Sequence, residues 1–269
     1  MARGAQTLKE TLALTGLTLN FGGLAAVSNM DLHLNEGELV GLIGPNGAGK
    51  TTVFNLLTGV YAPSSGQIEF QNEGTTYQLG GMKPHAICRA GIGRTFQNIR
   101  LFKRQPVLEN VMIALEPNLP CSLFDSFLHT PKQRRNEQEI RNQSLDLLQI
   151  MQLDTKADEL AENLSYGEQR RLEIARAMAT QPVLLLLDEP AAGMNPAETA
   201  QLTKLISWLR EEFKLTILLI EHDMSVVMRV CERIYVLDHG LVIATGTPAE
   251  VQSNPKVIEA YLGEEATDA

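Results

Sequence analysis

A glycine-rich run at residues 44–52 follows an apolar stretch, and it constrains the fold more than any other feature of the chain. The pattern G-x-x-x-x-G-K-[ST] is fitted by this run, which comprises Gly44, Pro45, Asn46, Gly47, Ala48, Gly49, Lys50, Thr51 and Thr52. We predict a buried strand at residues 39–43 and a helix at residues 53–58 that Gly59 closes. This strand–loop–helix order is the setting in which the pattern binds phosphate.

The residue types in the run suit a nucleotide triphosphate. Glycines let the backbone turn with its N–H groups directed at phosphate oxygens, and the N-terminus of the following helix favours an anion. We expect Lys50 to neutralise the β- and γ-phosphates and Thr51 to ligate Mg²⁺. The alternative is a glycine-rich strand-to-helix turn with an exposed lysine.

A second apolar strand, at residues 183–187, ends in two carboxylates. Because it has no polar alternation, we predict a strand buried on both faces, as in a parallel sheet. The carboxyl ends of such strands are where open α/β sheets bind ligands. We expect Asp188 to hold Mg²⁺ through water and Glu189 to polarise the attacking water. Alternatively, one of these carboxylates caps the turn that begins at Pro190.

Residues 164–171, Leu-Ser-Tyr-Gly-Glu-Gln-Arg-Arg, resemble the signature of the ATP-binding subunits of ABC transporters, which is usually Leu-Ser-Gly-Gly-Gln. Ser165, Tyr166, Gly167 and Gln169 carry the resemblance, with Tyr166 in place of the first glycine and Glu168 before Gln169. The resemblance implies that this segment grips the γ-phosphate of ATP bound to a second subunit. Ser165-x-x-Glu168 is also a helix capping box, and both interpretations hold together.

The other family elements follow in the expected order between about residues 8 and 263. The resemblance implies that Phe21 stacks on adenine, with Val27 against the ribose, although each alone would indicate core packing. It implies that Gln97 reaches Mg²⁺ and the attacking water, and that His222 contacts the γ-phosphate. Asn195 stands where most members carry the aspartate of the D-loop, so no D-loop carboxylate is available.

Within the family, the chain closely resembles LivG-type ATPases of branched-chain amino acid importers, on four runs: residues 94–97, 164–167, 191–196 and 220–224. This implies ATP and Mg²⁺ as ligands. It also implies transmembrane permease subunits, a second ABC ATPase (identical or similar) and, indirectly, a solute-binding protein as partners. The alternatives are an importer of urea or amides, a lipopolysaccharide exporter, and a soluble ABC ATPase of DNA repair or translation.

Charge and cysteine content exclude other classes. The 269 residues carry a net charge of −9, which argues against non-specific nucleic-acid binding. Three widely spaced cysteines indicate neither a zinc site nor a disulfide framework. Residues 11–30 are uncharged, but their glycines and polar residues predict a hairpin and not a membrane span. The start of the chain does not have the pattern of a signal peptide. We therefore expect a peripheral protein at the cytoplasmic face of the inner membrane, held there by its partner.

The predicted fold class is α/β: a P-loop, RecA-like ABC ATPase core with an antiparallel β edge and a helical subdomain insertion. We expect one domain over residues 8–263, a helical subdomain at about 98–163 and a polar tail at 264–269. Helices are predicted at 133–151, 196–213 and 225–233, strands at 215–220 and 234–237, and two short helical pieces at 248–262. An unusually apolar insertion at about 119–135 either packs on its own helices or contacts the transmembrane partner.

Overall fold

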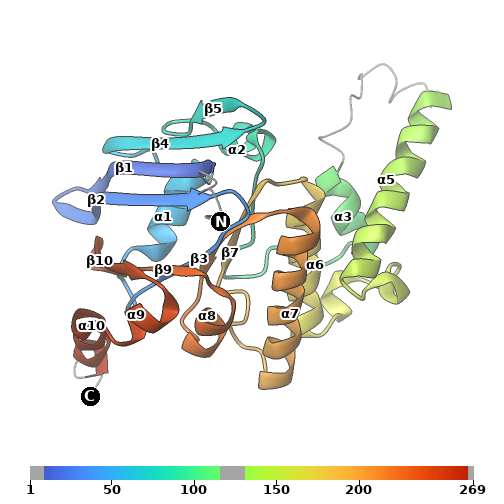
Figure 1. The fold of residues 1–269 in the computed structure, drawn as a ribbon. Coiled ribbons are helices and arrows are strands. Elements are labelled where there is room, and N and C mark those ends of the chain that lie inside the picture. The colour runs from blue at the N-terminus through green and yellow to red at the C-terminus, as the bar shows by residue number, and fades with distance from the viewer. Residues whose placement is uncertain (1–8, 116–130, 266–269) are drawn as a thin grey trace, which may run out of the picture.

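A six-stranded, mostly parallel sheet forms the centre of the fold in the computed structural model (Figure 1). The structure describes residues 9–115 and 131–265, without the side chains of 131–134 and 262–265. The strands lie in the order β10 (Leu241–Gly246), β9 (Arg233–Asp238), β3 (Leu39–Ile43), β8 (Thr216–Ile220), β7 (Leu184–Asp188) and β6 (Ile92–Arg94). All neighbours are parallel except the β9–β10 pair.

This sheet separates two hydrophobic cores. Successive residues of one strand point to opposite faces, so Leu39 packs in one core and Val40 in the other. Strands β3, β7 and β8 are buried along their whole length. Burial on both faces explains why these strands are continuously apolar.

A four-stranded antiparallel sheet covers one side of the central sheet (Figure 1). Its order is β2 (Leu24–Asn35), β1 (Glu10–Phe21), β4 (Ser65–Asn72) and β5 (Thr75–Gln78). Strands β1 and β2 form the hairpin predicted from the uncharged stretch, and Gly22 takes a positive φ of 59° at its turn. The fold class is therefore the predicted one, an α/β core with an antiparallel edge.

Helices fill the remaining layers, and α3, α5 and α6 stand together on the side away from the antiparallel sheet (Figure 1). The α-helices are α1 (Lys50–Leu57), α2 (Pro84–Ala90), α3 (Val107–Leu115), α5 (Pro131–Ile150), α6 (Tyr166–Ala179), α7 (Pro196–Phe213), α8 (Met224–Val230), α9 (Pro248–Gln252) and α10 (Pro255–Glu265). Two short 3-10 helices, η2 (Asp154–Lys156) and η3 (Ala161–Asn163), connect α5 to α6. Within the described residues, no helix has the length and apolar character needed to cross a membrane.

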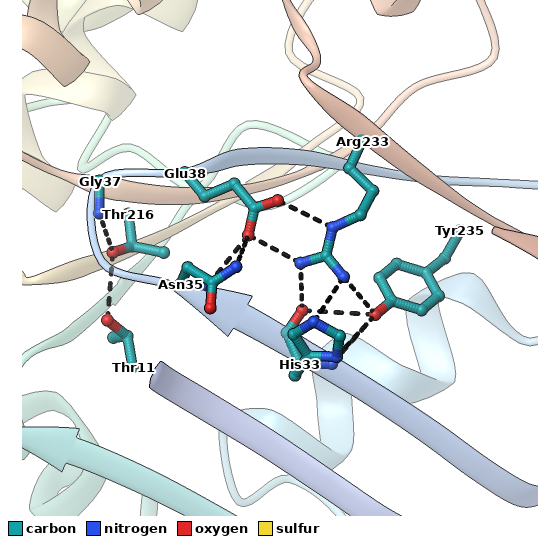
Figure 2. A network of polar contacts seen from close by, with 8 residues as sticks. All are labelled: Thr11, His33, Asn35, Gly37, Glu38, Thr216, Arg233 and Tyr235. Atoms are coloured by element: carbon teal, nitrogen blue, oxygen red, sulfur yellow. Dashed lines mark hydrogen bonds and ion pairs between the residues drawn. The ribbon is translucent and has the colours of Figure 1, made fainter. Parts of the chain in front are cut away.

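A polar network connects the antiparallel hairpin to the central sheet beside the first residue of β3 (Figure 2). Arg233 of β9 donates two hydrogen bonds to the Glu38 carboxylate, at 2.8 and 2.7 Å, and one to the His33 carbonyl at 2.9 Å. The Tyr235 hydroxyl accepts another from Arg233 at 2.8 Å. Burial acts against the Glu38 carboxylate, but these donors outweigh it and hold the Glu38 pKa below its ordinary value.

Some predicted boundaries are wrong, and the helix predicted at 53–58 already begins at Lys50. The helix expected at 225–233 ends at Val230, and Arg233 already belongs to β9, where it pairs with Val40. The backbone of Cys231 is extended, with φ −80° and ψ 136°, which ends the helix. The sheet partner and the bidentate contact with Glu38 therefore override the local helical pattern.

Candidate active site

The glycine-rich loop joins β3 to α1 in a conformation that depends on glycine at two positions. Gly44 has φ 150°, and a Cβ there would lie 1.9 Å from the Leu237 carbonyl oxygen. Gly49 has φ 105°, and its Cβ would lie 2.5 Å from the Ala26 carbonyl oxygen. Neither position has room for a side chain, so the loop lies directly against two neighbouring backbones.

Lys50, at the start of α1, is buried and turned back over the loop. Its ammonium donates to the carbonyl oxygens of Gly44 at 2.6 Å and Pro45 at 2.8 Å. The Ala48 carbonyl accepts from the Gly240 N–H at 2.9 Å, so the β9–β10 turn supports the loop from the other side. The loop thus encloses a cation at a helix N-terminus, which is the arrangement that favours an anion.

The two residues expected to contact the nucleoside differ in exposure to solvent. Phe21, at the end of β1, is 47% exposed, and the ring of Tyr61 meets it edge-on with 5.2 Å between ring centroids. Val27 is fully buried in the core under the antiparallel sheet. An exposed, supported ring can stack on a base, whereas the position of Val27 fits the packing alternative.

Asp188 ends β7 almost fully buried and is held by Arg94. Its Oδ2 atom accepts from the Arg94 guanidinium at 3.0 Å, and its N–H donates to the Thr95 hydroxyl at 3.2 Å. Within the part of the chain that the structure describes, its Oδ1 atom is buried with no hydrogen-bond partner. Burial raises the Asp188 pKa, and Arg94 opposes this effect.

These donors fit Mg²⁺. Mg²⁺ prefers oxygen ligands and keeps several waters, so one free carboxylate oxygen and one hydroxyl at a phosphate site suffice. Asp188 Oδ1 has no partner in residues 9–115 and 131–265, and Thr51 is exposed in the first turn of α1. A buried carboxylate oxygen without a donor is costly unless a ligand completes it.

Glu189, Gln97 and His222 come together although they are far apart in sequence. The Gln97 amide donates to Glu189 Oε2 at 2.9 Å, and His222 Nδ1 lies 3.7 Å from the same oxygen. Glu189 has φ 45°, and its N–H donates to the Ile220 carbonyl at the end of β8. A glutamate in the left-handed region is uncommon and marks strain at a position of special geometry.

The loop that carries Gln97 is held by a buried ion pair on α6. Arg170 is fully buried and donates to the carbonyl oxygens of Phe96 at 2.7 Å and Gln97 at 3.0 Å. Glu173 pairs with Arg170 at 2.8 Å and accepts from the N–H groups of Phe96 and Arg100, each at 3.3 Å. The start of α6 and the segment 96–100 are therefore one hydrogen-bonded unit.

The predicted capping box at the start of α6 is present. Ser165 accepts from the Glu168 N–H at 3.4 Å, and the Glu168 carboxylate accepts from both the N–H (2.9 Å) and the hydroxyl (3.0 Å) of Ser165. Tyr166 is 44% exposed, and its hydroxyl lies 3.3 Å from an Arg170 nitrogen. Gly167 is buried, and Gln169 donates back to the Leu164 carbonyl at 2.9 Å.

Asn195 caps α7. Its side-chain oxygen accepts from the N–H groups of Ala197 and Glu198, both at 3.0 Å. The sequence predicts a D-loop position for Asn195, and the cap is an additional finding.

Four residues that shape the site were not singled out from sequence: Arg94, Arg170, Glu173 and Glu221. Glu221 is fully buried, accepts from the Ala191 N–H at 2.8 Å and lies 4.0 Å from His222 Nδ1. Local sequence patterns do not mark these residues, because partners of theirs lie up to 94 residues away. Most of the predicted insertion at 119–135 lies outside the described residues.

Two family profiles match the chain. The profile described as "ABC transporter" matches residues 27–192, which include the glycine-rich loop, Gln97, the Ser165 segment, Asp188 and Glu189. A second profile, "Branched-chain amino acid ATP-binding cassette transporter", matches residues 242–267 at the C-terminal end.

Individual proteins resemble the chain over nearly its whole length. It is 51% identical to the "High-affinity branched-chain amino acid transport ATP-binding protein LivG" of Salmonella typhimurium, over 94% of this chain and 98% of the relative. It is 47% identical to the protein BraF of the same description from Pseudomonas aeruginosa, over 95% and 99%. The crystal structure of the ADP conformation of an ATP-binding cassette of an ABC transporter superposes with a TM-score of 0.81 at 31% identity, covering 95% of this chain and 99% of that one.

Proposed function

The chain belongs to the family of ABC transporter ATP-binding subunits, and from that premise we propose that it is the ATP-hydrolysing subunit of an importer of branched-chain amino acids. Identity of about half to LivG and BraF over almost all of each chain supports this branch. The observation that carries the ATPase mechanism is the grouping of Gln97, Glu189 and His222 beside the phosphate loop.

Nucleotide binding would begin at the loop. The β- and γ-phosphates of ATP would draw Lys50 away from the carbonyls of Gly44 and Pro45. They would accept hydrogen bonds from the N–H groups of Gly44, of residues 46–49 and of Thr52. The exposed ring of Phe21, which Tyr61 supports, would stack on the base. Thr51 and Asp188 would hold Mg²⁺, which neutralises charge developing on the transferred phosphoryl group.

Glu189 would act as the general base for hydrolysis. In this structure its carboxylate accepts from Gln97, so Gln97 must exchange that contact for the attacking water when the site closes. His222 is 62% exposed beside Glu189 and is free to meet the γ-phosphate. The three side chains thus orient one water and one phosphoryl group, which is what hydrolysis by positioning requires.

The site of one subunit would be completed by a second ATPase, identical or similar. Ser165 and Gly167 stand at the N-terminus of α6, with Tyr166 and Gln169 beside them, and this terminus would bind the γ-phosphate held by the other copy. Asn195 would lie at the same interface. ATP would therefore close the dimer, and hydrolysis would reopen it.

A permease would dock in a groove on the helical side of the chain. This groove has a volume of about 570 Å³ and is lined by Val60, Phe96, Arg100, Phe102 and Arg176, among others. Phe102 and Val60 are exposed apolar residues, and Arg100 and Arg176 lie against the rings of Phe96 and Phe102. A cytoplasmic permease segment with apolar and acidic side chains fits this surface and would hold the subunit at the cytoplasmic face of the membrane.

Transport assays test the proposal. A strain lacking this gene is expected to lose uptake of labelled leucine while uptake of urea and export of lipopolysaccharide stay normal. Complementation with the wild-type gene restores uptake, whereas Arg100→Glu restores it poorly because a charge in the groove is reversed. Loss of urea uptake or of lipopolysaccharide export with normal leucine uptake would contradict the substrate and leave the ATPase assignment standing.

A further inference from the structure

Arg94 joins three elements of the active site, and the roles proposed above do not use it. It ends β6, and its side chain is 6% exposed. One guanidinium nitrogen donates to Asp188 Oδ2 at 3.0 Å. The other donates to Asn55 Oδ1 at 2.8 Å and Thr58 Oγ1 at 3.0 Å, both on or next to α1. Arg94 therefore connects the strand that ends in Asp188 to the helix that begins at Lys50.

The guanidinium is held in one plane. It lies against the rings of Phe54 and Phe96, with its central carbon 5.5 and 4.9 Å from their centroids. Because the guanidinium is a rigid planar fork, fixing its plane and its Nη1 atom also fixes the direction from which Nη2 meets Asp188. Asn55 and Thr58 thus set where the carboxylate of Asp188 points.

Arg94 makes the two carboxylate oxygens of Asp188 different. Arg94 occupies one carboxylate oxygen and leaves Oδ1 buried and without a partner among the described residues. An unpaired Asp188 could rotate so that either oxygen faced the phosphate loop. With Arg94 in place, only Oδ1 is available to a ligand.

We infer that Arg94 is a positioning residue that holds Asp188 by Oδ2 and so keeps Oδ1 free to hold the Mg²⁺ that Thr51 would share. This inference rests on the proposed ATPase function. Arg94 also borders the groove proposed for the permease. A residue that served only to fill the space between α1 and β7 would stabilise the fold without changing how Mg²⁺ affects nucleotide binding.

The test measures binding of a fluorescent ATP analogue to the full chain, in EDTA and in Mg²⁺, without any turnover. For Arg94→Gln we expect unchanged affinity in EDTA and a loss of about tenfold or more in the Mg²⁺-dependent gain, as is usual for residues that orient metal ligands. Arg94→Lys should recover part of the gain, because it keeps the charge but not the fork. Asp188→Asn should lose the gain, and adding Arg94→Gln to it should change nothing further.

Two further variants protect the test against misfolding. Asn55→Ala removes one anchor of the guanidinium and leaves the ion pair with Asp188. It should lower the Mg²⁺-dependent gain in affinity by a smaller factor than Arg94→Gln does. Arg210→Gln breaks an exposed ion pair with Glu232 and should leave the gain unchanged. If Arg94→Gln and Asn55→Ala both keep the wild-type increase in affinity on adding Mg²⁺, the inference about Arg94 is overturned and the proposed function stands. A wild-type chain that binds no nucleotide would instead overturn the proposed function.

Discussion

Replacing Arg170 with methionine removes the residue that joins the signature helix α6 to the loop of Gln97. The wild-type guanidinium donates to the carbonyls of Phe96 and Gln97 and pairs with Glu173, all at 2.7–3.0 Å and out of contact with water. Methionine fills a similar volume and donates nothing. The substitution therefore leaves Glu173 as a buried carboxylate without its cation.

The expected cost follows from this burial. Removing one partner of a buried pair costs about 3–5 kcal/mol, because the other charge stays buried and unpaired. One kcal/mol corresponds to about 2–4 °C in Tm for a domain somewhat smaller than this one. Arg170→Met should therefore lower Tm by about 10 °C. The kcat of the assembled transporter should also fall, because Gln97 loses the backbone support that holds it beside Glu189.

Thermal unfolding, amide exchange and ATPase assays separate these effects. The double variant Arg170→Met with Glu173→Leu should regain much of the lost Tm, because no buried charge remains unpaired. It should not regain kcat, since the carbonyls of Phe96 and Gln97 still lack their donor. The N–H groups of Phe96 and Arg100 now lose their acceptor as well and should exchange faster with solvent. The exposed-pair control Arg210→Met should cost no more than about 1 kcal/mol. Equal Tm values for Arg170→Met and this control, with unchanged exchange in the loop, would refute the reasoning.

Three other predictions follow from single residues. Gly44→Ala should weaken binding of a fluorescent ATP analogue about tenfold, because its Cβ would lie 1.9 Å from the Leu237 carbonyl oxygen. Backbone strain of this kind costs about 1–3 kcal/mol, and about 1.4 kcal/mol is a tenfold change in Kd. An unchanged Kd would show that the loop tolerates a side chain. Burial raises the Glu221 pKa above its ordinary 4.5. The stability that the protonated Glu221 contributes is therefore present below pH 4.5 and is lost as pH rises through the raised pKa. Glu221→Gln can still accept from Ala191, so it should raise Tm at pH 8 and lose this advantage as pH falls to 4.5 in a pH series of melting curves; a pH-independent difference would contradict the sign. Ser165→Arg should abolish hydrolysis by the assembled transporter while the isolated chain binds ATP normally, and a matching loss of affinity in the isolated chain would exclude action across a dimer interface.

Short-range patterns predicted the elements that carry the site. The buried strand before Gly44, the strand that ends in Asp188 and the capping box of Ser165 each depend on neighbouring residues, and all three are present. Helix α7, expected at 196–213, has those bounds because Asn195 and Lys214 mark its ends locally.

Long-range contacts could not be predicted in this way. Arg170 reaches the Phe96 carbonyl across 74 positions, and Arg94 reaches Asp188 across 94. The sequence places Arg94 beside Gln97 but contains no local sign that it pairs with Asp188. Glu189, which has a positive φ, likewise donates its N–H to the Ile220 carbonyl on a separate strand. Such features depend on which strands become neighbours, and that is decided by the whole sheet.

The central claim is that Glu189 activates water for ATP hydrolysis beside Gln97 and His222. The most direct measurement compares phosphate release by the transporter assembled with wild-type subunit and with Glu189→Gln. Glutamine keeps the size of the side chain but cannot accept the proton, and Lys50, Thr51 and Asp188 remain in place to bind ATP. Loss of a general base costs about 10²–10⁴ in rate, so turnover should fall below about one hundredth while the variant retains bound ATP. Turnover above about one tenth of wild type would contradict the account.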